Sequence, residues 1–374
     1  MKIMKLSLCF LFVGLLLVAQ EEQTRPAPRQ ATIQIAILLD TSNSMDGLIN
    51  QAKSQLWKIV NELATTKKNG KVPHLQVALY EYGKSSLSYS VGHIRMILPL
   101  TTDLDKVSEE LFALKTLGGQ EYCGWAIQNA TQQLSWGDSS HDFRAIFIAG
   151  NEPFTQGPVP FQKACKAAIE KGIVINTIHC GSHAEGVRGK WQEAALLSDG
   201  SYMVIDQNAQ VVHIEAPQDK EILALNGEMN KTYIPFGRGG EASQARQMAQ
   251  DSNAMGVSQE SSVQRALSKA SVHYRNTSWD LVDAAKEGQV SLEKIKEEEL
   301  PAEMQKMTLE QRKAYVKERE AKRAEIQEKI KKLNAEREKY VAEQRKSNSE
   351  ETTLDAVMIK ALRGQLKKRN YETK

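Results

Sequence analysis

The stretch Thr32-Ile-Gln-Ile-Ala-Ile-Leu-Leu-Asp40-Thr-Ser-Asn-Ser44 decides the fold. Its first part is a short, nearly continuous apolar run that ends on a carboxylate, which is typical of a strand buried on both faces of a parallel sheet. Apolar residues then recur at helical spacing from Leu48 to Leu63. A buried strand followed directly by an amphipathic helix predicts an α/β unit with Asp40 at the carboxyl end of its strand.

The alternation of strands and helices continues as far as Asp206. We expect strands over residues 74–82, 93–100, 144–149, 173–180 and 202–206, and helices over residues 103–114, 124–134, 161–171 and 187–197. Elements of this length imply crossover connections between parallel strands. The sequence therefore predicts an α/β fold over residues 32–206, with a doubly wound, mostly parallel sheet flanked by helices and ligands bound at the carboxyl ends of the strands.

The N-terminus has the layout of a secretory signal. Lys2 and Lys5 precede an apolar stretch that ends at Ala19. Because a membrane-spanning helix needs roughly 20 apolar residues, we expect cleavage after residues 1–19 and membrane association only through an uncleaved signal. The exported chain would begin with a disordered leader over residues 20–31 and reach the periplasm, the cell surface or the medium. The net charge of +3 gives no indication of nucleic-acid binding.

Three cysteines remain after cleavage, namely Cys123, Cys165 and Cys180. An oxidising compartment would allow one disulfide, and the sequence does not choose among the three pairings. The alternative is that all three are small buried side chains.

The last third of the chain is a helical extension of different character. Residues 207–290 contain helical and loop segments, residues 291–347 read as a long charged helix, and residues 348–374 as a short amphipathic helix and tail. The long helix has a heptad-like seam that consists of Ile326, Ile330, Leu333 and Tyr340. Arg323 and Arg337 interrupt this seam at a-type positions. Two interpretations stay open: a coiled coil that mediates oligomerisation, and a solvated helix packed on its own domain.

The motif Asp40-Thr-Ser42-Asn-Ser44 is suited to a divalent cation. A strand that ends on Asp40 places a carboxylate at the edge of the sheet, and the following turn brings two hydroxyls to the same point. Hard oxygen ligands of this kind suit Mg²⁺, and Mn²⁺ or Ca²⁺ would use the same donors. Few protein anions would leave such a cation able to accept a carboxylate from a partner. The alternative is a Ser-rich turn that caps the next helix.

In this context the Asp-x-Ser-x-Ser motif resembles the metal-ion-dependent adhesion site of the von Willebrand factor A family. The resemblance covers residues 32–206 and looks closest to secreted bacterial members of mostly unassigned function. Members of the family generally bind other proteins, often through the metal, and are not usually enzymes. The sequence also lacks a His-Glu-x-x-His motif, a nucleophile elbow and a Gly-rich phosphate loop, so no enzymatic activity is expected.

Two positions depart from the metal loops of the family. In the loop Gly118-Gly-Gln-Glu121, a Glu stands where the family has a Thr. At the end of the fourth strand, Gly150 stands where the family has an Asp. One carboxylate is lost and another is gained, so our hypothesis is that Glu121 supplies the missing charge.

The predicted metal site therefore consists of Asp40, Ser42, Ser44 and Glu121, with Gln120, Asn151, Glu152 and His183 around it. The expected function is that of an exported module that binds a protein partner presenting a carboxylate. The rival is a vestigial metal site in a structural scaffold of a cell-envelope complex, assembled through the helical tail. His179 and Cys180 end another strand on the same rim, and we expect structural roles for them.

Overall fold

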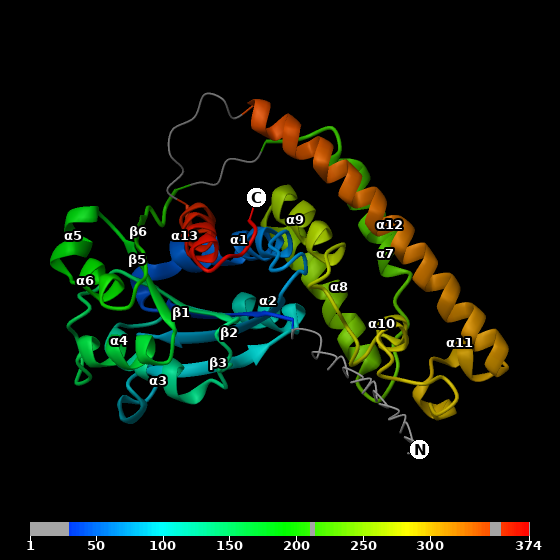
Figure 1. Ribbon diagram of the computed structural model, residues 1–374, viewed down its shortest axis with the longest axis horizontal. Helices are drawn as coiled ribbons and strands as arrows, with labels where there is room; N and C mark the ends of the chain where they lie inside the picture. The colour runs from blue at the N-terminus through cyan, green and yellow to red at the C-terminus, as the bar shows by residue number, and fades with distance from the viewer. Residues whose placement is uncertain (1–29, 210–213, 345–352, 374) are drawn as a thin grey trace, which may run out of the picture.

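The central sheet has six strands in the order β3-β2-β1-β4-β5-β6. The computed structural model describes residues 30–209, 214–344 and 353–373, so the predicted signal over residues 1–19 and the leader up to residue 29 lie outside the described residues (Figure 1). The strands are β1 (Thr32–Asp40), β2 (His74–Tyr82), β3 (Ile94–Thr101), β4 (Phe143–Gly150), β5 (Val174–Cys180) and β6 (Tyr202–Ile205). β3 runs antiparallel to β2, and the other pairings are parallel. The predicted doubly wound, mostly parallel sheet is confirmed.

β1 is the central strand, between β2 and β4. All its residues except Ile37 are buried, as a continuous apolar run predicts. The strand order reverses between β1 and β4, and in open parallel sheets the ligand crevice lies at the carboxyl ends of the strands at such a switch point. Asp40 is the last residue of β1 and stands at that place.

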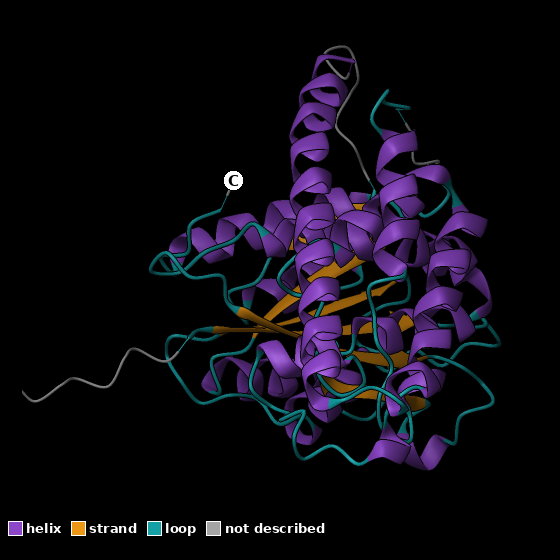
Figure 2. Cartoon of the chain, turned by 90° about the vertical axis from the view of Figure 1, so that its right-hand side faces the viewer, coloured by secondary structure: helices purple, strands orange, loops and turns teal. Residues whose placement is uncertain are grey.

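Helices cover both faces of the sheet (Figure 2). One face packs against α1 (Asp46–Ala64), α2 (Leu104–Ala113) and α13 (Leu354–Lys368). The other face packs against α3 (Cys123–Gln133), α4 (Phe161–Glu170) and α6 (Trp191–Leu196). The apolar side of each amphipathic helix is thereby removed from water, which is the main stabilising contribution in such a fold.

The prediction of a single helix over residues 187–197 is wrong. The chain forms two short helices, α5 (His183–Arg188) and α6, separated by Gly189 and Lys190. Lys190 has a φ of 70°, in the left-handed region, where a helix cannot continue. A capping box between Ser182 and Glu185 also begins α5 earlier than the apolar pattern indicates.

After β6 the chain leaves the sheet and forms a layer of helices. These are α7 (Asp219–Asn230), α8 (Gly240–Val257), α9 (Gln259–Lys269), α10 (Leu281–Lys286), α11 (Ala302–Gln305) and α12 (Leu309–Gln344). The long helix predicted from residue 291 begins only at Leu309. Thr308 and Gln311 exchange side-chain-to-backbone hydrogen bonds of 2.8 and 3.3 Å, and such a capping box fixes the start of a helix.

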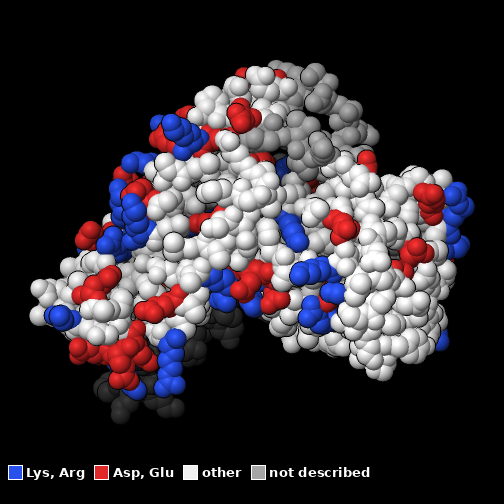
Figure 3. All heavy atoms as spheres, turned by 180° about the vertical axis from the view of Figure 1, so that it is seen from behind, with Lys and Arg blue, Asp and Glu red and all other residues white. Residues whose placement is uncertain are grey.

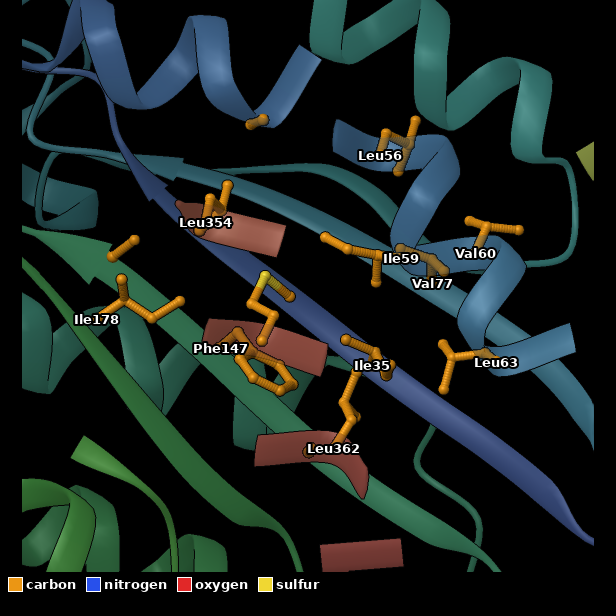
Figure 4. Packing of buried hydrophobic residues seen from close by; sticks show 14 of the residues in the cluster. Ile35, Leu56, Ile59, Val60, Leu63, Val77, Phe147, Ile178, Leu354 and Leu362 are labelled. Carbon is orange, nitrogen blue, oxygen red and sulfur yellow. The ribbon is translucent and has the colours of Figure 1, made fainter. Parts of the chain in front are cut away.

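α13 returns from this layer to the sheet domain. Leu354 and Leu362 belong to the same apolar cluster as Ile35 of β1 and Phe147 of β4 (Figure 4). The predicted amphipathic helix near the C-terminus is thus the element that closes one face of the sheet, beside α1.

The heptad-like seam of α12 faces the helices of its own chain. Ile326 and Ile330 are buried in a cluster with residues of α7 and α9, such as Ile222 and Val263. On the outer side of α12 acidic and basic side chains are mixed (Figure 3). In the described residues this helix therefore packs on its own domain, and Ile326 and Ile330 of the apolar seam are already covered.

The two arginines that interrupt the seam are buried and paired with acidic residues of other helices and loops. Arg323 lies 2.6 Å from Asp280 and 2.8 Å from Asp283, whereas Arg337 lies 2.6 Å from Asp219 and 2.5 Å from Glu260. These ion pairs fix the position of α12 on the helical layer.

A second buried ion network joins the helical layer to the sheet domain. The guanidinium of Arg265 in α9 lies 2.6 Å from Asp105 of α2 and 2.9 Å from Asp251 of α8. It also stacks on the ring of Trp57 of α1, at 4.4 Å from the ring centroid. Lys269 pairs with Asp251 as well, at 2.8 Å.

Cys123, Cys165 and Cys180 are free and buried. Burial raises the pKa of the Cys165 thiol to about 12, so this thiol is inert at neutral pH. Of the alternatives that the sequence leaves open, the structure has three small buried side chains.

Within the described ranges, no helix is both long and apolar enough to cross a bilayer.

Candidate metal site

Asp40 presents a buried carboxylate with an unused oxygen. Its Oδ1 accepts a hydrogen bond of 2.8 Å from the backbone N–H of Ser42. Its Oδ2 is buried and has no hydrogen-bond partner among the described residues. Burial, together with the charges of Glu121 and Glu152, raises the pKa of Asp40 to about 7, and the hydrogen bonds from Ser42 oppose this rise. A buried acceptor without a donor is costly and calls for a cation or a proton.

The two serine hydroxyls stand next to this carboxylate. Ser42 occupies the N-cap position of the 3₁₀ turn η1 (Asn43–Met45), yet its side chain makes no capping hydrogen bond in the part of the chain that the structure describes. Its Oγ lies 3.4 Å from Oγ of Ser44. The geometry therefore does not support the capping alternative at Ser42, and both hydroxyls lie within the group of polar side chains around Asp40.

The loop before α3 brings Glu121 to the same place. Backbone bonds tie this loop to the first one, because Asn43 N–H donates to the carbonyl of Gly118 at 2.8 Å and Leu117 N–H donates to the carbonyl of Thr41 at 2.9 Å. Glu121 is buried. Burial and the charge of Glu152 raise the pKa of its carboxyl group, and a hydrogen bond with the Ser42 side chain lowers it.

The end of β4 supplies an amide in place of a carboxylate. Gly150 has no side chain, and the next residue, Asn151, donates from Nδ2 to Oγ of Ser44 at 3.2 Å. Its Oδ1 is buried without a partner among the residues described. Glu152 accepts a hydrogen bond of 3.0 Å from Gln156 and acts on the crevice only through its charge.

The side chains of the other predicted rim residues contact aromatic residues. Gln120 accepts a hydrogen bond of 2.8 Å from the hydroxyl of Tyr122. His183 packs its ring against Tyr202 at 5.2 Å between centroids. His179 is buried against the ring of Trp191, at 5.6 Å, which is a packing role.

One residue of the site was absent from the sequence prediction. Tyr82, the last residue of β2, pairs in register with Asp40 and is fully buried. Its hydroxyl donates to the carbonyl of Ala149 at 2.9 Å. The sequence feature that could have indicated Tyr82 is its position at the carboxyl end of the strand beside β1, since ligand sites of parallel sheets lie at these strand ends.

The donor set fits a hard divalent cation. An unpartnered carboxylate oxygen, two hydroxyls and a second carboxylate converge, and all are oxygens of the kind that Mg²⁺ or Mn²⁺ prefers. No group of three or more His, Cys, Asp and Glu side chains is placed to hold a metal in the described ranges. A cation here would therefore depend on hydroxyls and water as well as on Asp40 and Glu121.

The family model of the von Willebrand factor type A domain matches residues 34–192, which include every residue of this crevice. The sheet domain is a von Willebrand factor type A domain. Domains of this family generally mediate protein–protein interactions and often bind a metal at the motif that Asp40–Ser44 represents here. The resemblance seen in the sequence is thereby confirmed.

Several solved structures are similar to part of this chain. A conserved hypothetical protein, BatB, from Bacteroides thetaiotaomicron is 22% identical, over 46% of this chain and 90% of its own, with a TM-score of 0.35. An aerotolerance-related membrane protein from Bacteroides fragilis is 21% identical, over 46% and 92%, with a TM-score of 0.33. Proximal thread matrix protein 1 of the mussel byssus, with a zinc-occupied adhesion-site motif, is 13% identical, over 47% and 42%, with a TM-score of 0.35. Among curated proteins none matches this sequence significantly.

Proposed function

We propose that this protein is an exported protein-binding module that engages its partner through a divalent cation at a rebuilt adhesion site, and that it is not an enzyme. The observation that carries the proposal is Oδ2 of Asp40, a buried carboxylate oxygen that no donor satisfies, beside two hydroxyls and Glu121. A cation bound there would offset the burial and the repulsion that raise the pKa of both carboxyl groups.

The oxygen ligands of the predicted site also support a partner that presents a carboxylate. Mg²⁺ takes six ligands, and the four side chains of the predicted site leave positions for water. Because water exchanges for a stronger anionic ligand, a carboxylate of a partner protein is the group best suited to complete the shell. The export part of the proposal is supported by the sequence of residues 1–19, with its positive start and apolar stretch.

Calorimetric titration of Mg²⁺ and Mn²⁺ into the exported form would test the metal site. We expect binding heat that the Asp40→Ala variant loses. Asp138→Ala is the matched control, because this exposed Asp lies in the loop before β4, at the opposite edge of the sheet. Equal heats for the wild type and Asp40→Ala would refute the proposal.

Affinity capture with Mg²⁺ and again with chelator would test the binding function. We expect at least one partner that is retained with Mg²⁺ and released by chelator. Capture that is identical in both conditions would show that the domain binds through another surface. The scaffold alternative receives less support, since the apolar seam of α12 is covered by α7 and α9.

A further inference from the structure

The side chain of Tyr82 crosses the sheet underneath the candidate metal site. Tyr82 ends β2, whereas the carbonyl to which it donates, that of Ala149, belongs to β4. Neighbouring strands are about 4.8 Å apart, so the side chain spans β1 at the level of Asp40. It lies on the face of the sheet that α3 covers, where Sγ of Cys123 is 3.8 Å from its hydroxyl.

The hydroxyl of Tyr82 lies where a side chain of residue 150 would begin. A Cβ added to Gly150 would be 2.5 Å from Oη of Tyr82 and 3.0 Å from Oδ2 of Asp40. The first distance is too short for any real contact. Because Tyr82 is fully buried and its hydroxyl is held by the carbonyl of Ala149, the ring cannot move aside without disturbing the core.

The opposite side of Asp40 is open to a side chain. Gly83 and Gly119 flank the carboxylate of Glu121: a Cβ at Gly83 would be 3.0 Å from Cγ of Glu121, and one at Gly119 would be 2.7 Å from its Oε1. Two glycines thus leave room for Glu121 next to Asp40, while Tyr82 fills the equivalent room on the side of β4.

We infer that Tyr82 is a positioning residue of this site, which excludes any side chain from position 150 and leaves Glu121 as the source of the second carboxylate. The steric part of this inference stands on the distances around Gly150 alone. The metal part rests on the proposed function. Two experiments separate the parts.

The first experiment is a double-mutant cycle in chelator, with thermal unfolding as the measurement. Tyr82→Phe removes the hydroxyl oxygen, which is the atom that a methyl group at position 150 would meet at the shortest distance, 2.5 Å. Gly150→Ala alone should lower the Tm by about 3–10 °C, the usual effect of overpacking, and by less than half as much in the Tyr82→Phe background. Equal losses in both backgrounds would overturn the steric part.

The second experiment measures Mn²⁺ binding by calorimetry in variants whose folding is checked by Tm. Glu121→Gln should weaken binding by about tenfold or more. Adding Gly150→Asp should restore affinity only when Tyr82→Phe is also present. Rescue without Tyr82→Phe, or no rescue with it, would overturn the metal part. If the wild type itself binds no Mn²⁺, the proposed function fails, and the first experiment still decides whether Tyr82 excludes a side chain at position 150.

Discussion

Substitution of Leu362 tests whether α13 packs on the sheet of the type A domain. Its side chain is fully buried, and it lies in the cluster that contains Ile35 and Phe147 (Figure 4). Leu362→Ala would remove apolar contacts on the sheet and leave a cavity, because the surrounding strands cannot collapse into the space. Substitutions of this kind cost about 2–5 kcal/mol, which corresponds to a Tm lower by about 5–15 °C for a domain of this size.

Urea denaturation followed by tryptophan fluorescence would measure the loss, since Trp57 and Trp191 are buried on the two faces of the sheet. Lys360→Ala is the matched control, because Lys360 lies on the exposed side of α13. We expect the control to change the free energy of unfolding by less than about 0.5 kcal/mol. If Leu362→Ala and Lys360→Ala cost the same, α13 does not pack on the sheet in solution.

Three further substitutions test the buried charges. Arg265→Ala should lower the free energy of unfolding by about 3–5 kcal/mol, because it leaves Asp105 and Asp251 buried without the guanidinium; a loss below about 1 kcal/mol in urea would contradict the network. Burial lowers the pKa of His273 from 6.5 to about 4, so its contribution to stability is complete above pH 6.5 and is lost as the pH falls toward 4. Stability should therefore fall by about 2 kcal/mol more between pH 7 and pH 5 in the wild type than in His273→Gln, and equal pH slopes would disprove this. Asp40→Asn should stabilise the protein in chelator by about 1 kcal/mol or more, since a buried charge is removed, and should abolish any rise of the Tm with Mg²⁺. Thermal unfolding with and without Mg²⁺ checks both outcomes, and a lower Tm in chelator would count against the site.

The fold could be predicted because its main signals are local. The apolar run of β1 and the helical spacing of α1 each lie within one segment, and the motif from Asp40 to Ser44 is contiguous. These signals also place Asp40 at the carboxyl end of its strand, whereas its position at the switch point follows from the strand order that the structure shows.

The remaining features depend on residues far apart in the sequence. The role of Tyr82 at the site follows from the register of β2 beside β1 and β4, which brings its side chain next to Asp40 and Gly150. In the sequence Arg323 interrupts the apolar seam of α12. Its ion-pair partner, Asp280, is the N-cap residue of α10, so the pair joins residues that are far apart in the sequence. The amphipathic pattern of α13 predicts a helix and its apolar side, but not the surface against which that side packs.

The position of α13 also has a consequence for how the protein is made. All six strands lie at or before Ile205, whereas the helix that covers one face of the sheet begins at Leu354. During synthesis the strands leave the ribosome first, and their apolar face is covered only by α1 and α2 until α13 follows. Chains that stop between these two points would contain the whole sheet and expose a surface that chaperones and proteases recognise. The C-terminal helix therefore delays the completion of the type A domain until the helical layer has been synthesised.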